Sequence, residues 1–459
     1  DLHSFPTRRS SDLEPAVAGI ETTARVYGYG SVATKVNLVR ADRQTPAYMR
    51  SPPEVPYVFA LETALDELAE KLGMDPVELR RVNDTMNDPI SGKPYSSRSM
   101  VECYDQAAKA FGWSARNPKP GSMRDGDWLI GMGCATAFYP TNVAAATARV
   151  KLYSDGKVLV QSASHEIGTG IRTVAAQMAA EELGVPYENV QVEMGDTELP
   201  PAPVSGGSNS TASVCSAVMK ACGQIRQQLF SAAAKAENGP LRDQETSSFS
   251  MKDGKVVAAN GASQKLQDVF GSAGAGAIEG YAEFIPEGVP PDAVRKLYAG
   301  RTTFREDAKQ KKIMYAIGAE FVEVRIHART REIRVPRLVG AFAAGRIMNT
   351  RTARSQLMGG LIWGMSSALL EWTEVDERNA RYINKDLAEY LVPVNADVQH
   401  VEVILVPEVD KDVNPAGVKG LGELGNVGTN AAISNAVYNA TGIRIRNLPL
   451  RLEDLLQTV

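Results

Sequence analysis

The sequence contains few residues that could form a metal or redox centre of its own. It has four cysteines and four histidines in 459 residues, and the cysteines form no C-x-x-C pair. This spacing predicts neither a structural zinc site nor an iron–sulfur cluster. Cys215 and Cys222 lie seven positions apart on a predicted helix, so we expect them to share one face as small packing residues. The remaining two are Cys103 and Cys134.

Long apolar runs and an excess of basic residues are also missing. The net charge of −4 excludes the basic footprint of a nucleic-acid-binding protein. The longest mainly apolar stretch, Leu357 to Leu370, is too short to span a bilayer and predicts a buried helix. With 44% hydrophobic and 23% charged residues, the chain can bury a sizeable core in two or more domains.

Residues 1–13 share no pattern with the rest of the chain. Ser4 to Leu13 is similar to one translated frame of a sequencing adapter, so we expect a non-native leader on a truncated reading frame. Arg8 and Arg9 are not followed by the apolar segment of an export signal. No targeting claim therefore follows from these residues.

Hydrophobic periodicity predicts mixed helices and strands. An amphipathic helix is expected over Val55 to Leu72, and a second begins where Asp75 caps and Pro76 takes the first helical position. Further along, Ser154 to Gly156 separates two strand-like segments and predicts a hairpin. Because strands and helices do not alternate strictly, the predicted class is α+β. Further strands are expected at Phe321 to Ile326, Arg331 to Val335 and Val401 to Val406.

Three loops rich in glycine or serine each precede a predicted helix. They are Pro415 to Asn430, which contains Glu423, then His165 to Arg172, and Ser205 to Thr211. Glycines let the backbone approach a ligand, and a helix N-terminus offers amides to an anion. The loops therefore favour a phosphate-bearing ligand with Glu423 as a base beside it. A glycine-rich turn with a solvated glutamate is the alternative interpretation.

Several of these segments resemble, in order and context, the molybdenum hydroxylases of the xanthine dehydrogenase and aldehyde oxidase family. The resemblance runs from about Glu21 to Leu450 and looks closest to the separate molybdenum-binding subunits of bacterial aldehyde-oxidising enzymes. The matching segments are Gly168 to Gly170, Ser205 to Ser213, Gly417 to Glu423, Met49 to Pro53, Asp75 to Asn83 and Ser355 to Gly360.

The resemblance implies two elongated molybdopterin-binding domains. Residues 14–114 would be the end of the first and residues 115–459 the second, with a linker over Ser114 to Asp127. The family's upstream Gly-Gly-x-Phe-Gly loop, which also contacts the cofactor, is not among these residues.

The implied chemistry is oxidative hydroxylation of an aldehyde or an N-heterocycle with water as the oxygen source. Glu423 would be the general base, and Arg50 would orient substrate or stabilise negative charge. The metal would be held by the pterin dithiolene and not by protein side chains. The cofactor, expected in its cytosine dinucleotide form, would contact Gly168, Thr169, Gly170, Arg172, Gly206, Gly207, Ser208, Ser210, Thr211, Arg80, Gln356, Lys419, Gly420 and Gly422.

Two departures from the purine-oxidising relatives bear on the substrate. Arg50 lies in Met-Arg-Ser-Pro-Pro instead of Phe-Arg-Gly-Phe-Gly, which argues against purines, and Thr169 stands where those relatives have glutamine.

The resemblance also implies partners. An iron–sulfur subunit with 2Fe-2S clusters and an FAD-binding subunit would carry electrons away, because this chain encodes no cluster of its own. No nucleic acid and no membrane insertion are expected. The compartment stays open between bacterial cytoplasm and periplasm, since an export signal can lie on the iron–sulfur partner.

Two alternative functions compete with this interpretation. Gly420, Gly422 and Gly425 spell the G-x-G-x-x-G fingerprint of a NAD-dependent dehydrogenase, although no predicted strand ends at Gly420. The chain could also be a catalytically inert cofactor-binding fragment or scaffold.

Overall fold

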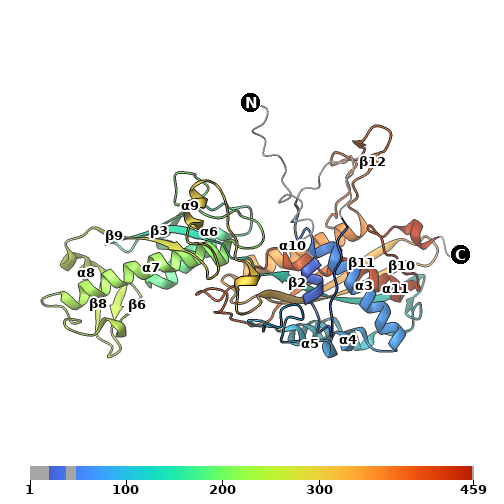
Figure 1. Cartoon of the computed structure of the whole chain (residues 1–459), viewed down its shortest axis with the longest axis horizontal. Coiled ribbons are helices and arrows are strands. Elements are labelled where there is room, and N and C mark those ends of the chain that lie inside the picture. The colour runs from blue at the N-terminus through green and yellow to red at the C-terminus, as the bar shows by residue number, and fades with distance from the viewer. Residues whose placement is uncertain (1–19, 38–47, 457–459) are drawn as a thin grey trace.

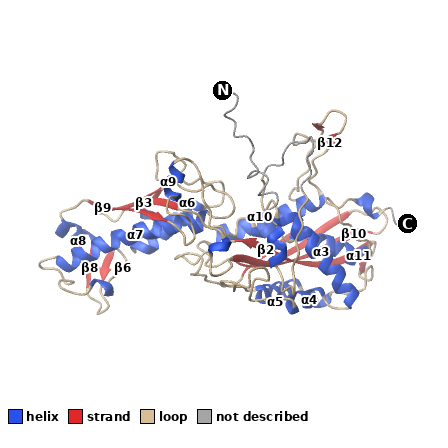
Figure 2. Cartoon of the chain, in the orientation of Figure 1, coloured by secondary structure: helices blue, strands red, loops and turns tan. Residues whose placement is uncertain are grey.

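The structure is a computed structural model that describes residues 20–37 and 48–456. The predicted leader, residues 1–13, lies outside the described residues. The described chain is elongated and forms two lobes (Figure 1). The smaller lobe is built from the chain between β2 (Trp128–Pro140) and β10 (Tyr315–His327). Helices and strands occur in both lobes (Figure 2), which confirms the α+β prediction.

A five-stranded sheet forms the centre of the larger lobe, in the spatial order β1-β2-β10-β11-β14. β2, β10 and β11 pair antiparallel, whereas β14 runs parallel to β11. The three strands predicted in this part of the sequence overlap observed ones. The remaining bounds are β1 (Arg124–Asp125), β11 (Ile333–Ala343) and β14 (His400–Leu405).

Successive residues of the strands point to opposite faces of this sheet, so each face has its own core. Phe321 of β10 packs against α5 (Met100–Phe111), whereas the next residue, Val322, shares a cluster with α11 (Thr429–Thr441). The α11 face also carries α3 (Glu54–Leu72) and α10 (Thr350–Leu369). The predicted buried helix at Leu357 to Leu370 is therefore the greater part of α10.

The first helices begin as the sequence predicts. Asp75 accepts hydrogen bonds from the amides of Val77 (2.8 Å) and Glu78 (3.3 Å), and Pro76 is the first residue of α4 (Pro76–Val82). The short α2 (Ile20–Arg25) precedes α3. The cap determines where α4 begins.

A four-stranded sheet forms the smaller lobe, in the order β5-β4-β3-β9. Its central pair, β3 (Ala146–Tyr153) and β4 (Val158–Gln161), is the predicted hairpin. Two helices that share a core with the sheet bring their N-termini toward the larger lobe (Figure 1). The further bounds are β5 (Val190–Glu193), β9 (Ala277–Phe284), α6 (Ile171–Leu183), α7 (Ser210–Lys235), α8 (Leu266–Ala273), α9 (Ala293–Tyr298), β6 (Ser250–Lys252), β7 (Lys255–Val257) and β8 (Ser263–Lys265).

All four cysteines are buried and free. Cys215 and Cys222 lie in the core of the smaller lobe with no thiol partner, as packing residues do.

In the described part of the chain, no helix is long and apolar enough to cross a membrane. A small hairpin, β12 (Val375–Asp376) and β13 (Arg381–Tyr382), projects from the larger lobe (Figure 1). The 3-10 helices are η1 (Trp113–Ala115), η2 (Tyr187–Asn189), η3 (Thr246–Ser248), η4 (Asp307–Lys309), η5 (Leu424–Asn426) and η6 (Leu452–Leu455).

Residues on both sides of the predicted domain boundary at residue 114 share one core. The rings of Phe111 and Phe321 lie 5.6 Å apart, and Trp113 packs edge-on against Phe321 at 5.2 Å. The structure instead divides into the two lobes, the smaller of which is formed by the chain between β2 and β10. The boundary between residues 14–114 and 115–459 stays a prediction.

Candidate active site

The carboxylate of Glu423 receives hydrogen bonds from three segments that are far apart in the sequence. The amide of Ser51 donates to Oε1 (3.1 Å), and the hydroxyls of Tyr139 (2.6 Å) and Ser208 (3.1 Å) donate to Oε2. Burial, and then the charge of Glu423, raise the pKa of Tyr139 well above its usual value, so its phenol remains a donor. Glu423 is therefore held in one orientation by the loop before α3, the end of β2 and the loop before α7.

Two of these donors have unusual backbone conformations. Ser51 and Ser208 have positive φ angles of 54° and 57°, which non-glycine residues rarely adopt. Each also contacts the Glu423 main chain: the Ser208 hydroxyl accepts from the Glu423 amide (3.0 Å), and the Ser51 hydroxyl donates to the Glu423 carbonyl. Such strain is kept where the surrounding structure determines the geometry, and it concentrates at functional sites.

Arg50 lies next to Ser51 and is half-buried against α10. Its Nη2 donates to the carbonyl of Gln356 (2.6 Å), its guanidinium lies 6.0 Å from the Trp363 ring, and its buried Nε has no hydrogen-bond partner. Burial lowers the pKa of Arg50, although the charges of Glu423 and Glu320 oppose that shift. The Gln356 side chain in turn donates to the carbonyl of Gly168 (3.4 Å), which links Arg50 to the loop before α6.

The loop before α6 binds a carboxylate from its own chain. Glu166 accepts hydrogen bonds from the amides of Gly168 (2.9 Å), Gly170 (3.0 Å) and Arg172 (3.1 Å). Partial burial works against ionisation, but these amides, with that of Thr169, lower the pKa of Glu166. Glu166 thus occupies amides of this loop in the structure, and the expected pterin or phosphate contact of Gly168, Thr169 and Gly170 stays a prediction. The Arg172 guanidinium donates to the carbonyl of Val192 (2.6 Å), and its cofactor role stays a prediction.

The N-terminus of α7 differs, because no side chain caps it. Two side-chain hydrogen bonds hold the loop before α7 in place. Asn142 donates to the carbonyl of Gly207 (2.9 Å), and Asn209 donates to the carbonyl of Gly206 (2.6 Å). A Cβ added at Gly206 would meet nothing within 4 Å. The predicted contacts of Gly206, Gly207, Ser208, Ser210 and Thr211 with a cofactor therefore surround an accessible helix end.

The structure corrects two predicted cofactor residues. Lys419 is 1% exposed, and its Nζ lies 3.2 Å from Glu408 and 3.3 Å from Asp410. Arg80 is fully buried, and its Nε lies 2.7 Å from the carboxylate of Glu62, which is also fully buried. A bound molecule cannot reach either cation, because each is enclosed by acidic partners within the fold.

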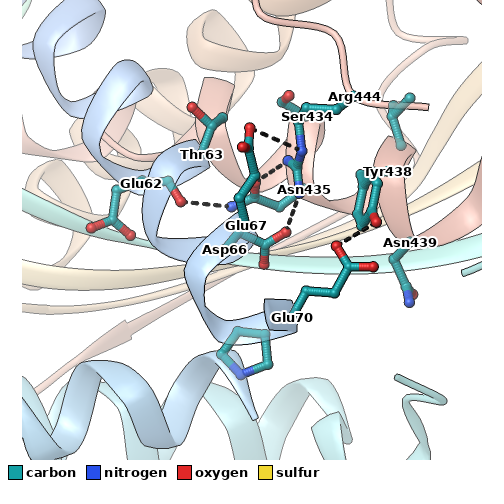
Figure 3. A network of polar contacts seen from close by, with 12 residues as sticks. Glu62, Thr63, Asp66, Glu67, Glu70, Ser434, Asn435, Tyr438, Asn439 and Arg444 are labelled. Carbon is teal, nitrogen blue, oxygen red and sulfur yellow. Dashed lines mark hydrogen bonds and ion pairs between the residues drawn. The ribbon is translucent and has the colours of Figure 1, made fainter. Parts of the chain in front are cut away.

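The polar network of Figure 3 holds together the two helices that follow the site. Arg444 lies 2.6 Å from Asp66 of α3 and donates to the Asn435 side chain of α11 (2.7 Å). Asn435 donates to the carbonyl of Glu62 (3.3 Å), which also belongs to α3. Because α3 follows Arg50 and Ser51 while α11 follows Glu423, this network keeps the two halves of the site in register.

The predicted dinucleotide fingerprint has no room for a dinucleotide. A Cβ at Gly420 would lie 2.4 Å from the carbonyl oxygen of Ser208, and one at Gly425 would lie 2.7 Å from that of Leu357. Within the described residues, Gly420 follows an isolated bridge at Val418 and not a strand. These glycines are needed because protein backbone, and not a ligand, packs against them.

Sequence reasoning missed two residues of the site, Ser51 and Tyr139, as donors to Glu423. Ser51 lies in the segment that contains Arg50, so that segment was the signal for it. Tyr139 lies on β2 with nothing in its sequence neighbours to mark it. Among the described residues, no group of His, Cys, Asp and Glu could hold a metal ion.

Comparison with known proteins agrees with this site. Residues 106–399 and 9–84 match two family models, each described as a molybdopterin cofactor-binding domain. The chain is 40% identical over 438 residues to the aldehyde oxidoreductase molybdenum-binding subunit PaoC of Escherichia coli K12, covering 95% of this chain and 56% of PaoC. It is 29% identical over 436 residues to the xanthine dehydrogenase molybdenum-binding subunit of Escherichia coli O157:H7, covering 92% of this chain and 54% of that subunit.

Solved structures share the fold. Quinoline 2-oxidoreductase from Pseudomonas putida 86 superposes with a TM-score of 0.76 at 21% identity, covering 89% of this chain and 52% of that chain. The aldehyde oxidoreductase of Desulfovibrio desulfuricans ATCC 27774 gives 0.72 at 23% identity, covering 96% and 44%. The chain spans about half the length of the curated relatives it matches. It belongs to the molybdopterin cofactor-binding domain family, together with the molybdenum-binding subunits of aldehyde oxidoreductases and xanthine dehydrogenases.

Proposed function

We propose that this chain is the substrate-oxidising part of a molybdenum-dependent oxidoreductase that hydroxylates an aldehyde to a carboxylic acid, or an N-heterocycle at carbon. The observation that carries this proposal is the fixed Glu423 carboxylate, held between two serines with positive φ, one of which directly follows Arg50. The 40% identity to an aldehyde oxidoreductase subunit favours an aldehyde as substrate.

The residues present fit a molybdenum cofactor with a phosphate-bearing tail. The uncapped α7 N-terminus, with open space at Gly206, would receive an anionic group, and Ser210 and Thr211 would add hydroxyl donors. We propose the cytosine dinucleotide form of the cofactor. When bound, the cofactor supplies the two-electron oxidation and delivers a water-derived oxygen to the substrate carbon.

The chain's own residues would manage protons and charge. Glu423 would accept one proton on its carboxylate, because its three donors leave oxygen lone pairs free. The Arg50 guanidinium would stabilise negative charge that develops on the substrate oxygen. Oxidation of an aldehyde consumes one water and releases two protons and two electrons. We propose that the electrons pass to an iron–sulfur subunit with 2Fe-2S clusters and then to an FAD-binding subunit.

Aldehyde-dependent dye reduction by the chain, co-expressed with its partner subunits and compared at matched molybdenum content, tests the proposal. We expect Glu423→Gln to lower turnover by roughly 100- to 10,000-fold, the usual contribution of a general base. Glu188→Gln, at an exposed position of the smaller lobe, is the matched control and should be unchanged. Turnover of Glu423→Gln within about threefold of wild type would disprove the assignment of Glu423 as the base.

A further inference from the structure

The segment of residues 371–399, which connects α10 to β14, contributes no buried residue to the core. Each of its residues is half-buried or exposed. It includes the hairpin of β12 and β13 that projects from the larger lobe (Figure 1). Its large apolar side chains that are at least 42% exposed are Trp372, Tyr382, Ile383, Leu387, Leu391, Val392 and Val394. Apolar side chains gathered in this way indicate an interaction site, because a partner would remove them from water.

Polar contacts within this segment fix its shape. The Asn384 side chain accepts a hydrogen bond from the Glu374 amide (2.9 Å) and donates to the carbonyl of Trp372. The amide of Val394 donates to the Asp397 side chain (2.9 Å). The apolar side chains are therefore held in one arrangement before a partner binds, which lowers the entropy cost of binding.

A groove of about 1260 Å³ lies between this segment and the body of the larger lobe. Its apolar lining includes Leu369 at the end of α10, Leu452 of η6, and Trp372, Ile383 and Leu391 of the segment. Pockets for small molecules typically enclose roughly 300–1,000 Å³. A length of polypeptide therefore fits this groove better than a small molecule does.

The charges around the groove are mainly negative. Arg334 and Arg451 line it, but Arg334 pairs with Glu332 (2.7 Å) and Arg451 lies 4.8 Å from the centre of the Trp372 ring. The other acidic side chains of the lining are Glu374, Glu389, Asp397 and Glu453. Residues 371–399 contain seven acidic and three basic residues, an excess that equals the net charge of −4 of the whole chain. A partner with basic residues would complement this surface.

We propose that residues 371–399 and the adjoining groove are the docking surface for a partner subunit whose contacting segment combines apolar and basic side chains. The relatives compared above are named as subunits, and the assignment of the partner to the same oxidoreductase rests on the proposed function. Along α10, Leu369 lies roughly 20 Å from Gln356, which contacts Arg50. The docking surface is therefore separate from the site around Glu423.

Hydrogen exchange locates the surface. The chain alone is compared with the chain co-purified with its iron–sulfur and FAD-binding subunits. Amides of residues 371–399 should exchange at least about tenfold more slowly in the complex, whereas those of α8 should not change. Equal exchange of residues 371–399 in both samples would overturn the proposal. So would protection that is already complete in a dimer of the chain alone, because a second copy would then cover the surface.

Charge reversal tests the complementarity. The triple variant Glu374→Lys, Glu389→Lys and Glu453→Lys should bind the purified subunits at least about tenfold more weakly at 0.15 M salt, with a smaller difference at 1 M. The matched control makes the same charge change at exposed positions of the smaller lobe. It combines Glu188→Lys, Glu237→Lys and Glu245→Lys. Equal binding by the two triple variants would overturn the proposal.

A second pair of variants tests the apolar contacts. Leu387 and Val394 are 89% and 60% exposed, so the double variant Leu387→Ser and Val394→Ser should unfold in urea like wild type but bind the subunits more weakly. The control, Leu72→Ser with Val82→Ser, changes side chains that are 57% and 59% exposed and should bind normally. Normal binding by both would overturn the proposal. These measurements need no substrate, whereas failure of the proposed function would be seen as turnover by Glu423→Gln.

Discussion

Replacement of Lys419 by methionine tests whether this residue belongs to the fold or to a cofactor site. The lysine is 1% exposed, and it donates to the carbonyl of Tyr315 (2.9 Å) besides pairing with Glu408 and Asp410. Methionine keeps much of the apolar stem but leaves both carboxylates buried without a cation. The expected damage is therefore to the stability of the chain, with or without cofactor.

Breaking a buried ion pair from one side typically costs about 3–5 kcal/mol. We expect the lower end, about 3 kcal/mol, because Asp410 keeps hydrogen bonds from Ser96 (2.5 Å) and Ser97 (3.0 Å). Burial works to raise the pKa of Asp410, but Lys419 and these hydroxyls more than offset it and hold the pKa below its usual value. That stabilisation is present above the usual pKa of an aspartate and is lost at lower pH, so the deficit of Lys419→Met should shrink as the solution is acidified.

The assay is urea unfolding of the cofactor-free chain at pH 7 and at lower pH. Lys312→Met is the matched control, because Lys312 forms an exposed pair with Asp412 (2.6 Å) that should contribute little. Adding Glu408→Gln and Asp410→Asn to Lys419→Met should restore part of the stability. If Lys419→Met unfolds like the control, the structural role is refuted and the sequence-based prediction of a cofactor contact gains support.

Two further changes test how the site is assembled. Gly420→Ala places a Cβ 2.4 Å from the carbonyl of Ser208, so we expect less molybdenum per chain and lower turnover. The control Gly271→Ala, in α8 of the smaller lobe, meets nothing within 4 Å and should bind and fold normally. Equal metal content in both variants would contradict this account. Arg444→Met leaves the buried carboxylate of Asp66 unpaired, and urea unfolding should show a loss of about 3 kcal/mol. Unchanged stability would mean that the α3–α11 network does not hold the site together.

Local sequence patterns predict most of the secondary structure. The cap at Asp75 and the hairpin at Ser154 to Gly156 depend on residues a few positions apart, so they can be read from the chain. Glu423 was singled out because glycines surround it and because its segment resembles a known family. The sequence therefore determined the elements, the family and the central carboxylate.

Tertiary structure alone decided which residues surround Glu423 and what two predicted cofactor residues do. Ser51, Tyr139 and Ser208 are 372, 284 and 215 positions away from it. Their meeting depends on how the two lobes and α3 pack, which no local preference encodes. A lysine in a glycine-rich loop has the same sequence signature whether it binds a phosphate or is buried between two acids. For Lys419 the packing of the segment that carries Glu408 and Asp410 decided between these roles, because only burial removes the charge from the reach of a ligand.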